Sequence, residues 1–315
     1  MTVTIASIVA ALLLGFDTTR FMAWRRKLVS SLASESKVIT TAGGDIEYKI
    51  YGEHGEDVLF LHGSPGGFDQ YGIHRSEFFK DYRVIAPSRF GYLRTPLGDV
   101  ESMEDQANAM AMFLDALGVD KVIVSAGSGG GPLALALAAY HPERVRLMLL
   151  YATASQAMEL SDDRPGVKAL KAITRSDFLS WLLLTRLMRK PEQTVRLLVK
   201  NPINSDLIIE SGKAEQFANA ISVAMPPSLR KTGMDNDELM LRSLDIPKAR
   251  ITAPTLIVHG EKDEHVAYEQ SEQLHQQLAD SRLISIPEGD HFMGYTHAEQ
   301  IDAAYKEFFD SHRFC

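Results

Sequence analysis

A glycine-rich segment between two apolar runs constrains the fold of this chain more than any other feature. Residues 122–124 are branched and apolar, as in a buried strand, and residues 132–140 have the apolar composition of a buried helix. A tight turn between a strand and a helix forces its central residue, Ser128, into a strained backbone conformation, so its neighbours must be small. The residues two before and two and three after Ser128 are Ala126, Gly130 and Gly131. The segment therefore predicts a sharp turn that holds the Ser128 side chain above the edge of a sheet.

Two other interpretations of this segment are weaker. If Ser125 were the exposed residue of the turn, Ile123 would lie two positions before it, where a branched side chain clashes with the turn. A phosphate-binding loop would end in Gly-Lys-Ser/Thr or read Gly-x-Gly-x-x-Gly, and neither pattern occurs here. The segment is therefore interpreted as a nucleophile elbow with Ser128 as the nucleophile.

From residue 37 onward, short β-rich runs alternate with longer helical runs. This alternation is typical of a mostly parallel sheet with helices on both faces. The expected strands are residues 37–41, 46–51, 58–61, 84–86, 122–124, 147–151, 256–258 and 283–286. The expected helices include residues 103–117, 132–140, 268–278 and 298–309. We therefore predict an α/β fold with an eight-stranded, mostly parallel sheet.

The alternation stops between residues 155 and 245, where helical segments are separated by prolines and no strand pattern appears. This predicts a helical lid at 155–245 inserted into a core made of 37–154 and 246–315. Large apolar residues of the lid should bury against the core or line a partly apolar substrate pocket. They include Phe178, Trp181, Leu182, Met188, Phe217 and Met225.

A serine hydroxyl is a weak nucleophile at neutral pH and needs a base and an orienting acid. The run 254–263 predicts a buried strand that ends in a loop with Asp263, and His291 follows the last expected strand. Glu261 is the alternative acid, but it lies nearer the strand. Among the ten histidines, only His291 lies after the last strand. Three other histidines lie near expected strand ends. We expect a structural role for His62, a position within a strand for His259 and exposure to solvent for His265.

The loop at residues 62–67 supplies the remaining requirement, donors for the negative oxygen of a tetrahedral intermediate. The backbone N–H groups of Ser64 and Gly129 are the expected oxyanion hole. Pro65 has no N–H and can only shape the loop.

Charge and cysteine content exclude several classes of protein. The chain has 315 residues, with 33 basic and 41 acidic residues and a net charge of −8, which argues against a nucleic-acid partner. Cys315 is the only cysteine, so neither an internal disulfide nor a thiolate metal cluster can form. We expect no cofactor, no metal and a small-molecule acyl substrate. The oligomeric state is left open.

The N-terminal segment, residues 1–36, is the unusual part of the sequence. Residues 2–16 carry no charge, and the basic cluster at 25–27 follows them, an order that disfavours a secretory signal. The apolar run is shorter than the roughly 20 residues of a spanning helix. Two interpretations stay open: residues 1–24 contact a membrane, or they pack on protein, within the chain or in a dimer. In the first case the catalytic domain is expected on the cytoplasmic face.

Six motifs together resemble the α/β-hydrolase superfamily over about residues 37–315. They are HGSPGG at 62–67, APSRFG at 86–91, GSGGG at 127–131, HPERV at 141–145, GEKD at 260–263 and DHF at 290–292. The resemblance is to the lidded, cofactor-free branch of small esterases, lactonases, carbon–carbon hydrolases and proline iminopeptidases. One departure is Ser88, where many members carry an aspartate. Dehalogenase and epoxide hydrolase branches use an aspartate as nucleophile, so Ser128 argues against both.

The expected function is a serine hydrolase that cleaves a carboxylic ester or related acyl bond through an acyl-enzyme on Ser128, with Asp263 and His291 completing the triad. Two alternatives remain. One is a hydrolase acting on carbon–carbon, lactone or aminoacyl bonds. The other is a non-catalytic ligand-binding protein of the same fold, since a fold does not guarantee a function.

Overall fold

The computed structural model describes residues 2–73, 76–159 and 173–312, with side chains from residue 17 onward. Eight strands form one sheet in the order β1-β2-β4-β3-β5-β6-β7-β8. Pairings β1–β2 and β2–β4 are antiparallel and all others are parallel, so the predicted eight-stranded, mostly parallel sheet is confirmed. The strands are β1 Lys37–Thr41, β2 Gly44–Tyr51, β3 Asp57–Leu61, β4 Arg83–Pro87, β5 Val122–Gly127, β6 Val145–Tyr151, β7 Thr255–Gly260 and β8 Ser281–Ile286.

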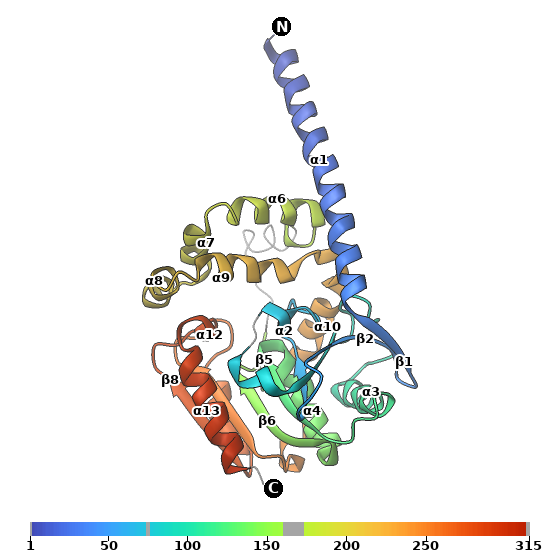
Figure 1. Ribbon diagram of the computed structural model, residues 1–315, viewed down its shortest axis with the longest axis vertical. Coiled ribbons are helices and arrows are strands. Elements are labelled where there is room, and N and C mark those ends of the chain that lie inside the picture. The colour runs from blue at the N-terminus through green and yellow to red at the C-terminus, as the bar shows by residue number, and fades with distance from the viewer. Residues whose placement is uncertain (1, 74–75, 160–172, 313–315) are drawn as a thin grey trace.

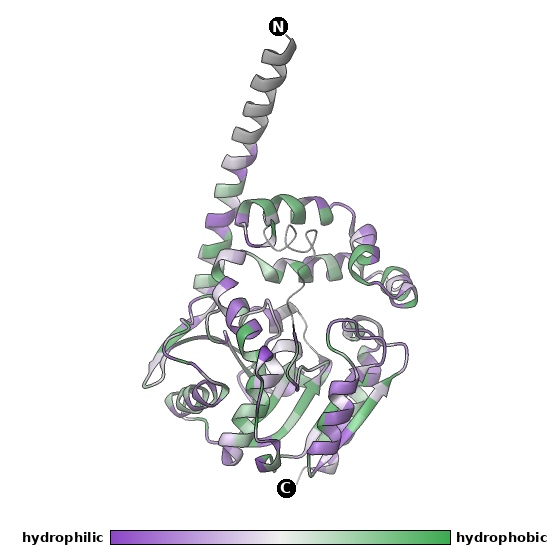
Figure 2. Cartoon of the chain, turned by 180° about the vertical axis from the view of Figure 1, so that it is seen from behind, coloured by the Kyte–Doolittle hydropathy of each residue, from purple (hydrophilic) through white to green (hydrophobic). Residues whose placement is uncertain are grey.

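Helices cover both faces of the sheet because its central strands are apolar on both sides. Helices α3 (Met103–Ala116), α4 (Gly131–Tyr140) and α11 (Glu269–Gln277) contribute to the apolar core on one face. Helix α13 (Ala298–Ser311) packs on the other face with the short helix η1 (Glu77–Asp81). Figure 2 shows the hydrophobic strands between these layers. The parallel strands end at one edge of the sheet, where the loops that carry polar side chains converge.

A helical insertion lies between β6 and β7, above the sheet in Figure 1. Its helices are α6 Asp177–Leu187, α7 Pro191–Leu198, α8 Pro202–Glu210, α9 Ala214–Ile221 and α10 Lys231–Arg242. Of the apolar residues expected to bury here, Trp181, Phe217 and Met225 do so, whereas Met188 is exposed. Met188 follows the last residue of α6, where that helix turns into α7, so no element packs over it.

The N-terminal helix α1 (Thr2–Glu35) passes the end of α6 on its way to β1 (Figure 1). Its described side chains Phe21, Trp24 and Leu28 pack against Phe178, Trp181 and Met225 of the insertion. Arg25 Nε also donates to the carboxylate of Asp177 at 2.7 Å. Among the described residues, no helix is both long enough and apolar enough to cross a membrane. The predicted membrane contact depends on the apolar residues 2–16. Their side chains lie outside the part of the chain whose side chains the structure describes.

Candidate active site

Ser128 begins the short helix η2 (Ser128–Gly130) between β5 and α4, as the sequence predicts. Its φ is +50°, a left-handed value that costs a non-glycine residue about 1–3 kcal/mol. Close packing explains the glycines that follow. A Cβ on Gly130 would lie 2.2 Å from the carbonyl oxygen of Leu61, and one on Gly131 would lie 1.8 Å from Thr153 Cγ2. The strained turn is therefore held between β3 and the end of β6.

Asp263 and His291 are in direct contact. The Nδ1 atom of His291 lies 2.7 Å from Asp263 Oδ2, while Asp263 Oδ1 accepts the backbone N–H groups of His265 and Val266 at 2.8 and 3.0 Å. Burial alone would raise the pKa of Asp263, but hydrogen bonds from His259 and His291 hold that pKa well below its usual range. The alternative acid, Glu261, is exposed. The geometry thus places the ionised Asp263 carboxylate, and not Glu261, against the imidazole.

His259 is a second histidine on the same carboxylate. It is fully buried in β7, and its Nε2–H is shared between the Val266 carbonyl oxygen at 3.0 Å and Asp263 Oδ2 at 3.2 Å. Its Nδ1 faces the hydroxyl of Ser271. The sequence analysis assigned this residue only to a strand. Its spacing of four residues before Asp263, at the strand end, was the available signal.

The loop that carries His291 is attached to the end of β6. The Tyr151 hydroxyl donates to the His291 carbonyl oxygen at 3.1 Å and accepts the Gly294 N–H at 2.8 Å. Tyr151 pairs with Gly127 in the sheet, immediately before Ser128. In the described part of the chain, no hydrogen bond joins the Ser128 hydroxyl to His291. Such contacts are often long until the substrate binds.

The predicted oxyanion residues lie together beside Ser128. A Cβ on Gly129 would lie 3.4 Å from the backbone nitrogen of Ser64, and one on Gly63 would lie 3.2 Å from Ser128 Cβ. The Gly66 N–H donates to the Gly63 carbonyl oxygen at 2.7 Å and closes the turn. The fold therefore brings the loop at 62–67 and the turn at Ser128, which are distant in sequence, together at the edge of the sheet.

A buried charge network holds this loop from behind. Both Arg89 Nη atoms donate to Asp237 of α10, each at 2.6 Å, and the Tyr92 hydroxyl donates to the same carboxylate at 2.6 Å. The Ser64 hydroxyl also contacts Asp237 and Tyr92. The residue before Arg89 is Ser88, which has no carboxylate, and the carboxylate partner of Arg89 comes from the insertion. The sequence analysis missed Asp237 because 148 residues separate the pair.

His62 connects this network to the sheet. It accepts the Arg89 N–H at Nε2, at 2.9 Å, and its Nδ1–H donates to the Gly63 carbonyl oxygen at 2.8 Å. Burial, followed by the charge of Arg89, lowers the pKa of His62 well below its usual range. The ring is therefore neutral, with both nitrogens committed to the backbone.

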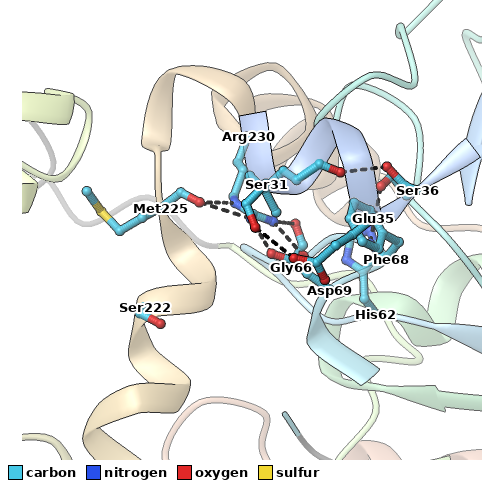
Figure 3. Close-up of polar contacts among 12 residues, drawn as sticks. Ser31, Glu35, Ser36, His62, Gly66, Phe68, Asp69, Ser222, Met225 and Arg230 are labelled. Atoms are coloured by element: carbon cyan, nitrogen blue, oxygen red, sulfur yellow. Dashed lines mark hydrogen bonds and ion pairs between the residues drawn. The ribbon is translucent and has the colours of Figure 1, made fainter. Parts of the chain in front are cut away.

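A second arginine ties the insertion to the same loop (Figure 3). Arg230 is fully buried and donates to the Gly66 carbonyl oxygen at 2.5 Å, to Asp69 Oδ2 at 2.7 Å and to the Met225 carbonyl oxygen at 3.0 Å. Charge-assisted contacts of this kind fix geometry more firmly than neutral ones. Two ion pairs, Arg230–Asp69 and Arg89–Asp237, thus join the insertion to the loop after β3, beside Ser128, and to the segment after β4.

A small cavity of about 20 Å³ adjoins His291 between the insertion and the core. Its lining includes Asn201 from the insertion and His265 and Phe292 from the core. The ring centroids of His265 and His291 are 4.9 Å apart. Three or more potential metal ligands do not cluster anywhere in the described residues.

The fold and the strained turn together define a class of protein. A family model described as the alpha/beta hydrolase fold matches residues 58–298, most of the chain. The chain belongs to this family, and the predicted superfamily is confirmed.

Relatives of known name are hydrolases or dehalogenases. The 2-hydroxymuconate semialdehyde hydrolase of Pseudomonas putida is 28% identical over 260 residues, which are 81% of this chain and 87% of the relative. Haloalkane dehalogenase 2 of Mycobacterium bovis is 25% identical over 293 residues, covering 87% and 95%. Among solved structures, an alpha/beta hydrolase fold protein from Nakamurella multipartita is 30% identical with a TM-score of 0.77, covering 87% and 98%. These similarities support a hydrolase.

Proposed function

We propose that this chain is a serine hydrolase with Ser128 as nucleophile, His291 as general base and Asp263 as the residue that orients it. The observation that carries the proposal is the 2.7 Å contact between Asp263 and His291 at the sheet edge where Ser128 adopts a φ of +50°. A positive φ at a serine costs conformational free energy, and packing a strand against a helix does not require this conformation. The conformation is explained if the turn serves to expose the side chain of the nucleophile.

In the proposed mechanism His291 takes the Ser128 proton at Nε2 as Oγ attacks an acyl carbon. Asp263 stabilises the imidazolium through its contact at Nδ1. The N–H groups of Ser64 and Gly129 stabilise the negative oxygen of the tetrahedral intermediate. The leaving group departs with the proton, and water then hydrolyses the acyl-enzyme by the same route.

We propose a carboxylic ester as the substrate class. The two buried arginines of the described chain, Arg89 and Arg230, each pair with a carboxylate of the chain itself. Neither is left to bind a carboxylate on a substrate. A neutral acyl compound therefore suits the buried loop beside Ser128 better than an anionic one.

The second candidate is hydrolysis of a carbon–carbon bond, favoured by the similarity to 2-hydroxymuconate semialdehyde hydrolase. A compound of that name contains no ester or amide, so its hydrolysis breaks a carbon–carbon bond. Its carboxylate would need a cation at the site, and Lys200 and Lys262 line the cavity beside His291. The dehalogenase similarity carries less weight, because Ser128 stands where the sequence analysis expects an aspartate in that branch.

The proposal also includes the helical insertion and the N-terminal segment. Residues 155–245 act as a lid over a small-molecule pocket, and the two ion pairs to residues 62–69 and 89 fix its base. The N-terminal segment, residues 1–24, contacts the cytoplasmic face of a membrane, which its uncharged run at 2–16 supports.

A substrate screen tests the proposal. Purified protein should hydrolyse aryl esters, and the Ser128→Ala variant should not, while lactones, aminoacyl arylamides and 2-hydroxymuconate semialdehyde react more slowly. Turnover of the semialdehyde alone would favour the second candidate. No turnover of any compound by folded protein, with ligand binding retained, would indicate a binding protein.

A further inference from the structure

The outward side of helices α6, α7 and α8 exposes large apolar side chains. This outer face of the insertion consists of Leu179, Leu183, Met188, Leu197, Ile203 and Leu207. They are six of the twelve large hydrophobic side chains that the described residues expose, yet they fall within residues 179–207. Single exposed apolar residues are ordinary, but such a concentration marks an interaction surface.

Two of these helices carry apolar residues on the side away from the protein core. Helix α6 buries Trp181 and Leu184 and exposes Leu179 and Leu183, so it carries apolar side chains on both sides, and Figure 2 colours much of it as hydrophobic. A surface helix in water normally has a polar outer side.

Helix α8 also carries apolar residues on both sides. It buries Ile208 together with Asn204 and Ser205, and it exposes Ile203 and Leu207. The exposed side chains of these helices therefore favour contact with an apolar environment over contact with water.

The charged residues around the outer face indicate which apolar environment it contacts. Residues 179–207, which span the outer face, contain five basic and two acidic residues, although the chain has a net charge of −8. Arg186, Arg189 and Lys190 are exposed between Leu183 and Leu197, and no salt bridge joins them to the described part of the chain. Apolar and basic side chains that alternate along helices are typical of contact with an anionic lipid surface.

We infer that the outer face of the insertion rests on an anionic lipid surface, with its leucines among the upper acyl carbons and its arginines at the phosphates. Helix α1 packs against α6, and Arg25 pairs with Asp177 at the start of α6. The uncharged residues 2–16 precede this contact in the same helix and supply a second lipid-binding element. The inference goes beyond the proposed hydrolase activity and does not depend on it.

Site-specific fluorescence in the full-length chain tests this inference. Cys315→Ser removes the only cysteine, and Leu183→Cys or Leu197→Cys then accepts a nitrobenzoxadiazole label. Met112→Cys, on α3 of the core, is the control, since Met112 and Leu183 are 40% and 37% exposed. Brominated-chain vesicles of phosphatidylcholine with phosphatidylglycerol should quench the labels at 183 and 197 but not at 112.

Two results would overturn the inference. In the first, the protein binds the vesicles while the labels at 183 and 197 stay unquenched, so that only the N-terminal segment holds it. In the second, the labels change with protein concentration in the absence of vesicles, which would mean that a second copy covers the outer face.

Two sets of charge variants distinguish binding through the outer face from general electrostatic attraction to the vesicles. Arg186→Gln, Arg189→Gln and Lys190→Gln combined should lower partitioning to the anionic vesicles by roughly tenfold or more, since one basic residue near the surface contributes about fivefold. The matched control removes three exposed core charges through Lys80→Gln, Lys121→Gln and Lys306→Gln. Equal losses in the two triple variants would contradict a specific role of the outer face.

Discussion

At the residue scale, the candidate site depends on a few directed hydrogen bonds to buried groups. The carboxylate of Asp263 meets His291 and His259 at one oxygen and two backbone N–H groups at the other. A carboxylate held in this way acts through the direction of its hydrogen bond and not through charge alone. This distinction separates Asp263 from its neighbour Glu261.

The first prediction compares those two acids. Asp263→Asn should lower the kcat for an aryl ester by about three to four orders of magnitude, because an amide presents the wrong partner to the imidazole. Glu261→Gln, on the exposed side of the same loop, should change kcat by less than about threefold. Melting temperatures of both variants control for unfolding. The reverse ranking would move the acid to Glu261, and two small effects would remove this loop from the mechanism.

The second prediction concerns pH and His62. The pKa of His62 is lowered in the folded chain, so below the unfolded value of about 6.5 the unfolded chain binds a proton that the folded chain does not. The stability contributed by neutral His62 is therefore present above that pH and lost as the pH falls, by at most about 1.4 kcal/mol per unit. Urea unfolding between pH 7 and 5 should show this loss.

His62→Gln is the control for that measurement, because an amide cannot titrate in this range. Its free energy of unfolding should be lower at pH 7, where the hydrogen bonds of the imidazole are lost, and should change less between pH 7 and 5. Parallel pH profiles for the variant and the parent would assign the slope to other groups.

At the element scale, helix α10 is attached by a buried ion pair to the segment that follows β4. Asp237 lies on α10, and Arg89 follows β4. Removing one partner of a buried pair leaves an uncompensated charge, which is far more costly than losing an exposed pair.

The third prediction uses two aspartates of that helix. Asp237→Asn should lower the free energy of unfolding by about 3–5 kcal/mol. Asp235→Asn removes an exposed pair with Arg175 and should cost less than about 1 kcal/mol. Tyr92→Phe, which removes one hydrogen bond to Asp237, should fall between them. Urea denaturation measures all three. Equal costs for the two aspartates would show that the buried pair does not hold α10.

The elements were largely predictable from sequence and the contacts between them were not. Strand β5 and helix α4 follow from a branched apolar run, a glycine turn and an apolar helix, all of which are local patterns. Asp263 and His291 could be chosen because each follows an expected strand. Asp237 could not, because a partner supplied by a distant helix leaves no local signature. His259 was not chosen, although it lies four residues before Asp263.

At the scale of the whole molecule, α1 is part of the folded protein as well as a candidate membrane segment. Phe21 and Trp24 pack on the insertion, so the place where the N-terminus is cut matters. The expected boundary of the anchor, residue 24, falls inside this packed cluster. A cut after residue 16 leaves the cluster whole.

The fourth prediction compares the two truncations. Removal of residues 1–16 should weaken membrane binding to what the outer face of the insertion provides, with the melting temperature and ester hydrolysis unchanged. Removal of residues 1–24 should lower the melting temperature by roughly 5 °C or more, because the truncation uncovers Trp181. Undiminished membrane binding after the shorter cut would show that residues 1–16 make no membrane contact. Unfolding after the shorter cut would make residues 1–16 part of the fold.

The central claim, that Ser128 is an activated nucleophile, is tested most directly by a fluorophosphonate probe and mass spectrometry of the labelled peptide. An activated serine beside a base reacts readily with such reagents, and an ordinary serine does not. The account predicts one label, at Ser128, which is lost in Ser128→Ala, retained in Ser125→Ala and slowed at least a hundredfold in His291→Ala. Folded wild-type protein that stays unlabelled, or a label that is lost in Ser125→Ala and kept in Ser128→Ala, would contradict it.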